Sequence, residues 1–155
     1  MSSSADGASP APLGVGLRIR SYDVADEAAV VALWRDCGLL RPWNDPHKDI
    51  ARKLTEQPEL FLVADLPGRP VVGTAMAGYD GHRGWVYYLA VAPDQRRLAM
   101  GRQLMQAVEA RLLALGCPKI NLMVRSDNQQ VMDFYQRLGY AQDASVSLGK
   151  RLIPD

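Results

Sequence analysis

The sequence has little of what metal sites, disulfide frameworks or membrane anchors require. Its two cysteines, Cys37 and Cys117, stand far apart with no second cysteine or histidine at ligand spacing. It has only two histidines, His47 and His82. No apolar run reaches the ~18 residues that a membrane-spanning helix needs, and the first residues lack the pattern of a secretion signal. We therefore predict a cytoplasmic protein with free thiols, no metal site and no membrane partner.

An excess of charge of one sign is also missing. The 155 residues carry 18 basic and 17 acidic side chains, which gives a formal net charge of +1. A protein that duplex DNA holds by bulk electrostatics needs a much larger basic excess. We predict no nucleic-acid partner, and any anionic ligand must be bound by a local arrangement of groups.

The chain begins with a low-complexity segment and continues as ordinary globular sequence. Twelve of residues 1–16 are Ser, Ala, Gly or Pro. This composition buries too little apolar surface to offset the entropy lost on ordering, so we predict a disordered tail over residues 1–16. The length of the remainder predicts one domain over residues 17–155.

Strand and helix patterns alternate along this domain. Short apolar or alternating runs predict strands over 17–20, 60–64, 71–79, 85–91 and 119–125, with further strand material over 140–152. Helical spacing predicts four helices, between Asp23 and Gly38, from Asp45 to about Gln57, from Met100 to Leu115 and between Asp127 and Gly139. The order of these elements predicts an α/β fold with a mixed sheet.

The segment that opens the third helix is chemically informative. Two arginines, Arg96 and Arg97, lead into it, small residues stand at Ala99 and Gly101, and Arg102 follows. A helix N-terminus presents unpaired N–H groups and a partial positive charge, which suit a phosphate. The pattern predicts a phosphate or pyrophosphate site, and it fits a plain helix start with solvated arginines equally well.

Two linked motifs resemble the GNAT (Gcn5-related) N-acetyltransferase superfamily. The run VAPDQRRLAMGRQLM is similar to the acyl-CoA loop R/Q-x-x-G-x-G/A of that superfamily, with Arg96 at its first position. The run DNQQVMDFYQRLGY is similar to the second signature N-x-x-A-x-x-F-Y-x-x-x-G-F/Y, with Val131 where alanine is usual. The resemblance extends over residues 17 to about 152. The segments RPWNDPHKDIARKL, GCPKI and SLGKRLI resemble the YpeA-like bacterial branch.

This resemblance implies a mixed, mostly antiparallel sheet with splayed central strands and about four helices. It also implies that acetyl-CoA is the acyl donor, with no metal. In the family, N–H groups of the loop hold the pyrophosphate, and the preceding strand pairs with the pantetheine arm. The residues that match these cofactor-binding positions are Leu89, Ala90, Val91, Arg96, Arg97, Leu98, Ala99, Met100, Gly101, Arg102, Asn128 and Tyr135.

By the same resemblance, Tyr135 is the general acid that protonates the departing thiolate. An N–H at the end of the strand over 85–91 would polarise the thioester carbonyl. The loop after the first helix would form part of the acceptor wall. The tentative acceptor residues are Trp43, Asn44, Tyr87 and Asn121.

Two features depart from the family pattern. Ala99 replaces a glycine, and we expect alanine to fit the helical turn there. The family's two positions for a base glutamate carry Trp85 and Met123. The remaining candidates are a substrate α-amine of pKa ~7.7–8.0, a water chain near Asn121, Tyr87 or Tyr88, and a distant carboxylate such as Asp45 or Asp80.

The resulting prediction is direct transfer of an acetyl group from acetyl-CoA to a primary amine of a small molecule or peptide, in a ternary complex. The alternative is a non-catalytic acyl-CoA-binding or interaction module on the same fold. Homodimers are common among such folds, so a second copy stays open as a partner.

Overall fold

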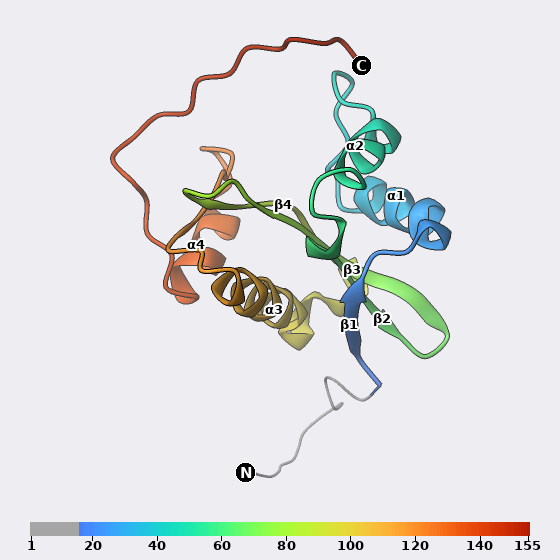
Figure 1. The fold of residues 1–155 in the computed structure, drawn as a ribbon. Helices are drawn as coiled ribbons and strands as arrows, with labels where there is room; N and C mark the ends of the chain where they lie inside the picture. The colour runs from blue at the N-terminus through green and yellow to red at the C-terminus, as the bar shows by residue number, and fades with distance from the viewer. Residues whose placement is uncertain (1–15) are drawn as a thin grey trace, which may run out of the picture.

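The computed structural model describes residues 16–155, except the side chains of Pro70, Arg96, Arg97 and Leu98. The predicted disordered tail therefore lies almost wholly outside the described residues. A five-stranded sheet organises the domain in the order β1-β2-β3-β4-β5 (Figure 1). Its strands are β1 (Arg18–Ser21), β2 (Phe61–Leu66), β3 (Arg69–Tyr79), β4 (Gly84–Val91) and β5 (Ile120–Leu122). All neighbouring pairs are antiparallel except β4 and β5, which confirms the predicted mixed, mostly antiparallel sheet.

The four predicted helices are present. They are α1 (Glu27–Asp36), α2 (Pro46–Lys53), α3 (Met100–Ala114) and α4 (Gln129–Arg137). Three short 3₁₀ helices, η1 (Val24–Asp26), η2 (Pro58–Leu60) and η3 (Pro93–Leu98), connect them to the strands. The structure thus confirms the α/β class that the alternating patterns predict.

The two aspartates that the sequence indicates as helix caps, Asp23 and Asp45, cap η1, which runs directly into α1, and α2. The side chain of Asp23 accepts a hydrogen bond from the backbone N–H of Ala25 and forms a capping box with Asp26. Asp45 accepts from the N–H of His47 at 2.9 Å, directly before Pro46 at the first helical position. Such caps satisfy N–H groups that the first helical turn leaves unpaired.

Helices cover both faces of the sheet. A Cβ atom at Gly73 or Gly84 would lie 2.9 Å from leucine side chains of α3, so the strands approach this helix closely. On the other face, the side chain of Thr74 bonds to Trp34 of α1. Figure 1 shows α3 and α4 on one side of β4 and α1 and α2 on the other. The two faces are called the α3/α4 face and the α1/α2 face below.

Several element ends differ from the sequence-based boundaries. The second helix ends at Lys53 rather than near Gln57, and β5 keeps only three of the seven predicted residues. Leu115, the predicted last residue of the third helix, follows the end of α3 at Ala114 and is 49% exposed. The cap of α4 is Asn128 rather than Asp127, because Asn128 stands directly before the first turn and its side chain accepts from the N–H of Val131.

The predicted strand material over 140–152 is wrong. Residues 140–155 form no strand, although their apolar residues alternate as those of a strand do. Val146, Leu148 and Leu152 are all more than four fifths exposed. Alternation alone does not make a strand, because a strand also needs a neighbouring backbone to complete its hydrogen bonds.

Side chains hold this terminal segment at both ends. We call residues 143–155 the C-terminal strap. At its beginning, Asp143 bonds to Lys119 at 3.0 Å and to Asn121 at 2.7 Å. At its end, Asp155 accepts from Arg52 at 2.7 Å and from the N–H of Asp45 at 2.9 Å. The strap therefore runs from β5 around to α2, as Figure 1 shows.

Candidate active site

The two central strands separate after a short paired stretch. Parallel pairing of β4 with β5 covers only Gly84–Val86 against Ile120–Leu122. Strand β4 then continues to Val91, whereas β5 ends. The splay that the family resemblance implies is therefore present, and it opens beside residues 87–91.

A β-bulge lies in β4 at this opening. Across the sheet, Ala90 pairs with Thr74 and Tyr87 pairs with Met76, so two residues of β4 oppose one of β3. Tyr88 is the distorted residue, with φ of +53°. Because the bulge interrupts the alternation of side chains, Tyr87 and Tyr88 both project toward the α1/α2 face.

Buried contacts hold the bulge in place. The Thr74 hydroxyl donates to the carbonyl oxygen of Tyr88 at 2.8 Å and accepts from Nε1 of Trp34 at 2.9 Å. The Trp34 and Tyr88 rings stack with centroids 3.7 Å apart. The Tyr88 hydroxyl donates to Oδ2 of Asp49 at 2.6 Å. Burial and this carboxylate raise the pKa of Tyr88. A left-handed backbone costs a non-glycine residue about 1–2 kcal/mol, which these contacts offset.

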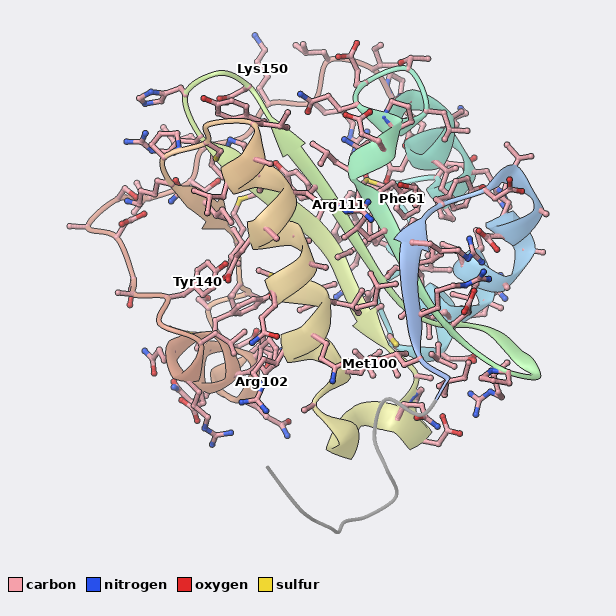
Figure 2. All side chains as sticks on the ribbon, turned by 60° about the horizontal axis from the view of Figure 1, so that its bottom comes forward. Phe61, Met100, Arg102, Arg111, Tyr140 and Lys150 are labelled. Carbon is pink, nitrogen blue, oxygen red and sulfur yellow. The ribbon has the colours of Figure 1, made fainter. Side chains whose placement is uncertain are left out.

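The loop after β4 leads into α3, whose N-terminus has no side-chain cap from the described residues. Residues 93–98 form η3, and α3 begins at Met100 without a side-chain cap from any described residue and without an acidic residue in its first turn. Its first N–H groups therefore suit an anion. The candidate side chains of Arg96, Arg97 and Leu98 lie outside the described residues. Figure 2 shows Met100 and Arg102 at this end of α3, far from Lys150 in the same view.

Ala99 does not occupy a helical turn, so the expectation made for it is wrong. Its backbone has φ of +59° and ψ of +21°, which is left-handed. The position favours glycine because a Cβ crowds the backbone in this conformation. The alanine therefore carries backbone strain at the point where the loop becomes the helix.

Gly101 has a packing role. A Cβ on this residue would lie 3.0 Å from Cζ of Phe134 and 3.8 Å from Cγ2 of Val91. The glycine thus lets the first turn of α3 approach α4 and the end of β4. The predicted phosphate site at this helix start would use the backbone N–H of the same residue.

Tyr135 is nearly buried on α4, with 9% of its surface exposed. Its ring meets those of Phe134 and Tyr140 edge to face, and Tyr140 is itself held by Glu109 at 2.6 Å. Burial raises the pKa of Tyr135 to about 12. Its hydroxyl has no hydrogen-bond partner among the described residues. A protonated hydroxyl held by aromatic packing suits a proton donor.

Asn128 has a structural task in addition to its predicted contact with the cofactor. Its Oδ1 accepts from the N–H of Val131 at 3.1 Å and caps α4. The side chain is exposed, and its amide nitrogen is not used in this cap. The residue that opens the second family motif therefore also caps the helix that carries Tyr135.

The four tentative acceptor residues lie on or near the α1/α2 face. Trp43 and Tyr87 are 54% and 47% exposed. Asn44 accepts a hydrogen bond from Arg151 of the C-terminal strap. Asn121 faces the same side as Tyr87, because it pairs with Trp85 two residues earlier on β4. Tyr87 and Asn121 thus share one face of the sheet, whereas Trp43 and Asn44 lie in the loop between α1 and α2.

The two distant carboxylates considered as bases have backbone partners. Asp45 caps α2 and Asp80 closes the hairpin between β3 and β4 by accepting from the N–H groups of His82 and Arg83. Those N–H groups lower the pKa of Asp80. Both carboxylates thus contribute to local structure.

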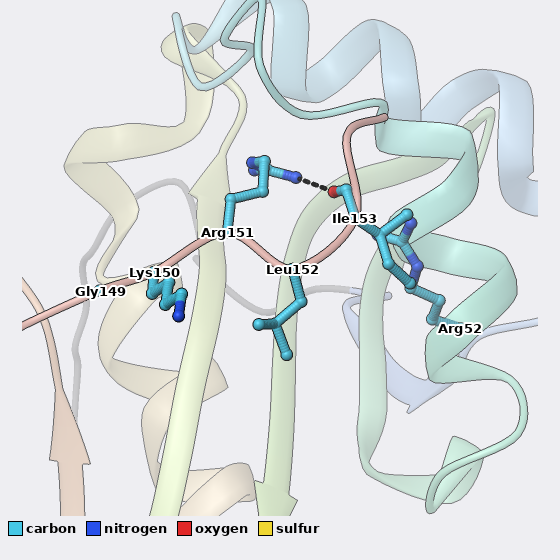
Figure 3. Close-up of a pocket in the computed structure, with 6 residues that line it drawn as sticks. All are labelled: Arg52, Gly149, Lys150, Arg151, Leu152 and Ile153. Carbon is cyan, nitrogen blue, oxygen red and sulfur yellow. Dashed lines mark hydrogen bonds between the residues drawn. The ribbon is translucent and has the colours of Figure 1, made fainter.

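Sequence reasoning missed Asp49, Thr74 and the strap residues Arg151 and Asp155. Asp49 and Thr74 carry no motif, and their meeting at Tyr88 depends on how α1 and α2 pack on the sheet. The alternation of the terminal segment indicated a strand instead of a strap. A hollow of about 530 Å³ lies between this strap and α2 (Figure 3). Its lining consists of Arg52, Gly149, Lys150, Arg151, Leu152 and Ile153.

Comparison with known proteins identifies the family of this chain. A model of the acetyltransferase (GNAT) family matches residues 27–140. A protein named acetyltransferase from Sodalis glossinidius is 53% identical over 140 residues, which cover 90% of this chain and 98% of that protein. Another from Yersinia enterocolitica is 50% identical over 139 residues, with the same two coverages of 90% and 98%.

Solved structures share the fold. Ard1 from Thermoplasma volcanium gives a TM-score of 0.70 at 26% identity, over 84% of this chain and 86% of that one. An acetyltransferase from Streptococcus agalactiae gives 0.73 at 21% identity, over 91% and 93%. These likenesses confirm the predicted architecture.

The chain therefore belongs to the GNAT acetyltransferase family. It is an N-acetyltransferase enzyme of a bacterial branch of that superfamily, as the two motifs indicated. Within residues 16–155, no helix is long and apolar enough to cross a membrane.

Proposed function

We propose that the enzyme transfers an acetyl group from acetyl-CoA to a primary amine of a small molecule or peptide, by direct attack in a ternary complex. The observation that carries this proposal is the bulged opening between β4 and β5. Tyr135 belongs to α4, which lies on the α3/α4 face, whereas Tyr87 and Asn121 belong to the other face of the sheet. Two reactants can thus meet from opposite sides of one sheet.

The residues around the opening fit acetyl-CoA. The N–H groups of Met100, Gly101 and Arg102 would hold its pyrophosphate, because no described side chain caps them. The backbone over 89–91 would run beside the pantetheine arm, since β4 continues past the end of β5. When bound, acetyl-CoA supplies the activated acetyl thioester.

The side chains then have separate tasks. An N–H at the bulge, beside Leu89, donates to the carbonyl oxygen on which charge develops. The Tyr135 hydroxyl, which like any tyrosine of ordinary or raised pKa is protonated at neutral pH, gives its proton to the departing sulfur. Trp43, Asn44, Tyr87 and Asn121 would contact the amine acceptor.

A two-part experiment tests the function. Acetyl-CoA should raise the melting temperature of the protein, and CoA thiol should be released when amines and peptides are added as acceptors. Stabilisation without release on any acceptor would leave only an acyl-CoA-binding module. Absence of stabilisation would contradict both the transfer reaction and the binding module.

We also propose a cytoplasmic location and leave the oligomeric state to measurement. Cys37 and Cys117 are both free thiols, which suits a reducing compartment. Sedimentation of the purified protein would show whether a homodimer forms.

A further inference from the structure

We propose that the hydroxyl of Tyr88 and the carboxylate of Asp49 form the proton acceptor for the attacking amine. This inference rests on the proposed function and names the group that the sequence could not identify. Tyr88 would contact the amine, and Asp49 would take up the proton through it.

The bulge makes this pair possible. In a regular strand, neighbouring side chains point to opposite faces, so Tyr88 would face α3. The left-handed backbone at Tyr88 turns its ring toward the α1/α2 face instead. There Asp49 of α2 accepts a hydrogen bond from the Tyr88 hydroxyl at 2.6 Å. The same distortion thus shapes the thioester-binding edge and positions a proton acceptor beside it.

The pair lies on the opposite side of the sheet from the general acid. Tyr88 packs on Trp34 of α1. Tyr135 packs on the α3/α4 face, next to Phe134, which contacts the start of α3. An amine that arrives from the α1/α2 face therefore meets the proton acceptor on its own side, while the sulfur departs toward the proton donor.

Neighbouring charges leave Asp49 able to act. Arg52 of the same helix lies 3.5 Å from Oδ1 of Asp49, whereas the other carboxylate oxygen, Oδ2, accepts the hydrogen bond from the Tyr88 hydroxyl. Arg52 and Arg151 also pair with Asp155, whose side chain is only 4% exposed. The Asp49 side chain is 24% exposed, so its proton has a route to solvent.

Other carboxylates fit the task less well. Asp45 and Asp80 each accept two backbone N–H groups in a cap or a turn. Asp155 is buried between two guanidinium groups. Asp49 alone among these four receives a tyrosine hydroxyl of β4.

The proposed transfer replaces the C–S bond of the thioester by a C–N bond. The lone pair of the amine forms the new C–N bond, and the C–S bond breaks. The proton leaves nitrogen for the Tyr88 oxygen while the Tyr88 proton moves to Asp49. Tyr135 supplies the proton that converts the thiolate to CoA thiol. Asp49 then releases its proton to solvent and Tyr135 regains one, so the products are the amide and CoA.

The test uses purified full-length variants Asp49→Asn, Tyr88→Phe and the double variant. Two defined acceptors serve as probes, alanylglycine amide for α-amines and Nα-acetyl-lysine amide for ε-amines. For the probe that the wild type acetylates, kcat should fall about 10²-fold or more in each single variant. The KM for acetyl-CoA should stay unchanged. The double variant should be no slower than either single one, because both residues act in one proton transfer.

Two further variants separate catalysis from structure. Asp49→Glu, which keeps the carboxylate, should recover part of the lost kcat. Asp36→Asn neutralises an exposed carboxylate at the end of α1 and should behave as the wild type. Tyr88→Phe retains the ring that stacks on Trp34, so its melting temperature should stay close to the wild-type value.

Each other outcome overturns the inference. Wild-type kcat in Asp49→Asn would show that the carboxylate takes no proton, and a loss of kcat in Asp80→Asn alone would move the base to the hairpin. If kcat falls only in variants whose melting temperature also falls, Tyr88 and Asp49 stabilise the fold and do not transfer the proton. If the wild type binds acetyl-CoA but acetylates neither probe, the proposed amine transfer fails first, and the inference falls with it.

Discussion

The rings of Trp34 and Tyr88 stack at 3.7 Å, with 11° between their planes. They join the first helix to the bulged residue of β4, and the hydroxyl of Thr74 bonds to both residues. The geometry of the opening between the central strands therefore depends on contacts from an element near the beginning of the chain.

The first prediction concerns Thr74. Thr74→Val keeps the side-chain shape but removes the hydroxyl, which leaves Nε1 of Trp34 and the carbonyl of Tyr88 without their buried partner. The free energy of unfolding should fall by about 1–3 kcal/mol, as for other buried groups left unsatisfied. Urea denaturation measures this. Thr55→Val, which removes an exposed hydroxyl at the end of α2, is the matched control and should cost much less. If the free energy of unfolding falls equally in both variants, the hydrogen bonds of Thr74 to Trp34 and Tyr88 do not stabilise the fold.

The second prediction concerns the strained alanine. Ala99→Gly should raise the free energy of unfolding by about 1 kcal/mol, because glycine adopts the left-handed backbone without a Cβ penalty. Ala107→Gly, in the middle of α3, should instead lower it by about 1 kcal/mol. Chemical denaturation of both variants measures whether each substitution raises or lowers the free energy of unfolding. A loss of stability in Ala99→Gly would mean that the loop does not hold this backbone in solution.

The third prediction concerns Tyr135. Tyr135→Phe should lower kcat about 10²-fold or more because the departing thiolate loses its proton donor, and acetyl-CoA should bind as tightly as before. Calorimetry and CoA-release kinetics measure the two quantities. Tyr140→Phe removes the neighbouring hydroxyl that bonds to Glu109 and should affect stability rather than kcat. Unchanged turnover in Tyr135→Phe would remove this residue from the mechanism.

The fourth prediction concerns pH and the strap. Arg52 and the N–H of Asp45 lower the pKa of Asp155 to about 2. Because folding lowers the pKa of Asp155, its contacts with Arg52 and Asp45 stabilise the fold fully above the ordinary aspartate pKa of ~3.9. This stabilisation is lost as the pH falls toward 2. At neutral pH, Asp155→Asn should release the strap and speed tryptic cleavage after Lys150 and Arg151. Gel analysis of timed digests measures this.

A matched variant makes the strap experiment decisive. Asp127→Asn neutralises an exposed aspartate outside the strap and should leave the cleavage rate as in the wild type. If Asp155→Asn is cut no faster than this control, the side chain of Asp155 does not anchor the strap.

Much of the architecture followed from local patterns. Asp23 and Asp45 marked helix starts because a short acidic side chain next to the first turn bonds to its N–H groups, whatever the rest of the fold. The start of α3 and the place of Tyr135 on α4 followed from two motifs of fixed spacing. Such features depend on neighbours a few residues away, so the sequence contains their cause.

The missed features depend on distant partners. The pattern over 140–152 predicted a strand, but no neighbouring strand of the described residues forms hydrogen bonds with it. Ala99 appeared compatible with a helical turn, but the turn from η3 into α3 requires a left-handed residue. Asp49 carried no signal, because its role arises only when α2 packs near the ring of Tyr88.

The scarcity of cysteine and histidine was enough to predict no sequence-encoded metal site, the lack of excess charge predicted that any anionic ligand must be bound by a local arrangement of groups, and the two motifs identified the family. Those conclusions rest on composition and short-range spacing. The tertiary structure alone decided which groups surround the opening in the sheet, because a bulge, a tryptophan and a carboxylate from three separate elements meet only after the helices have packed.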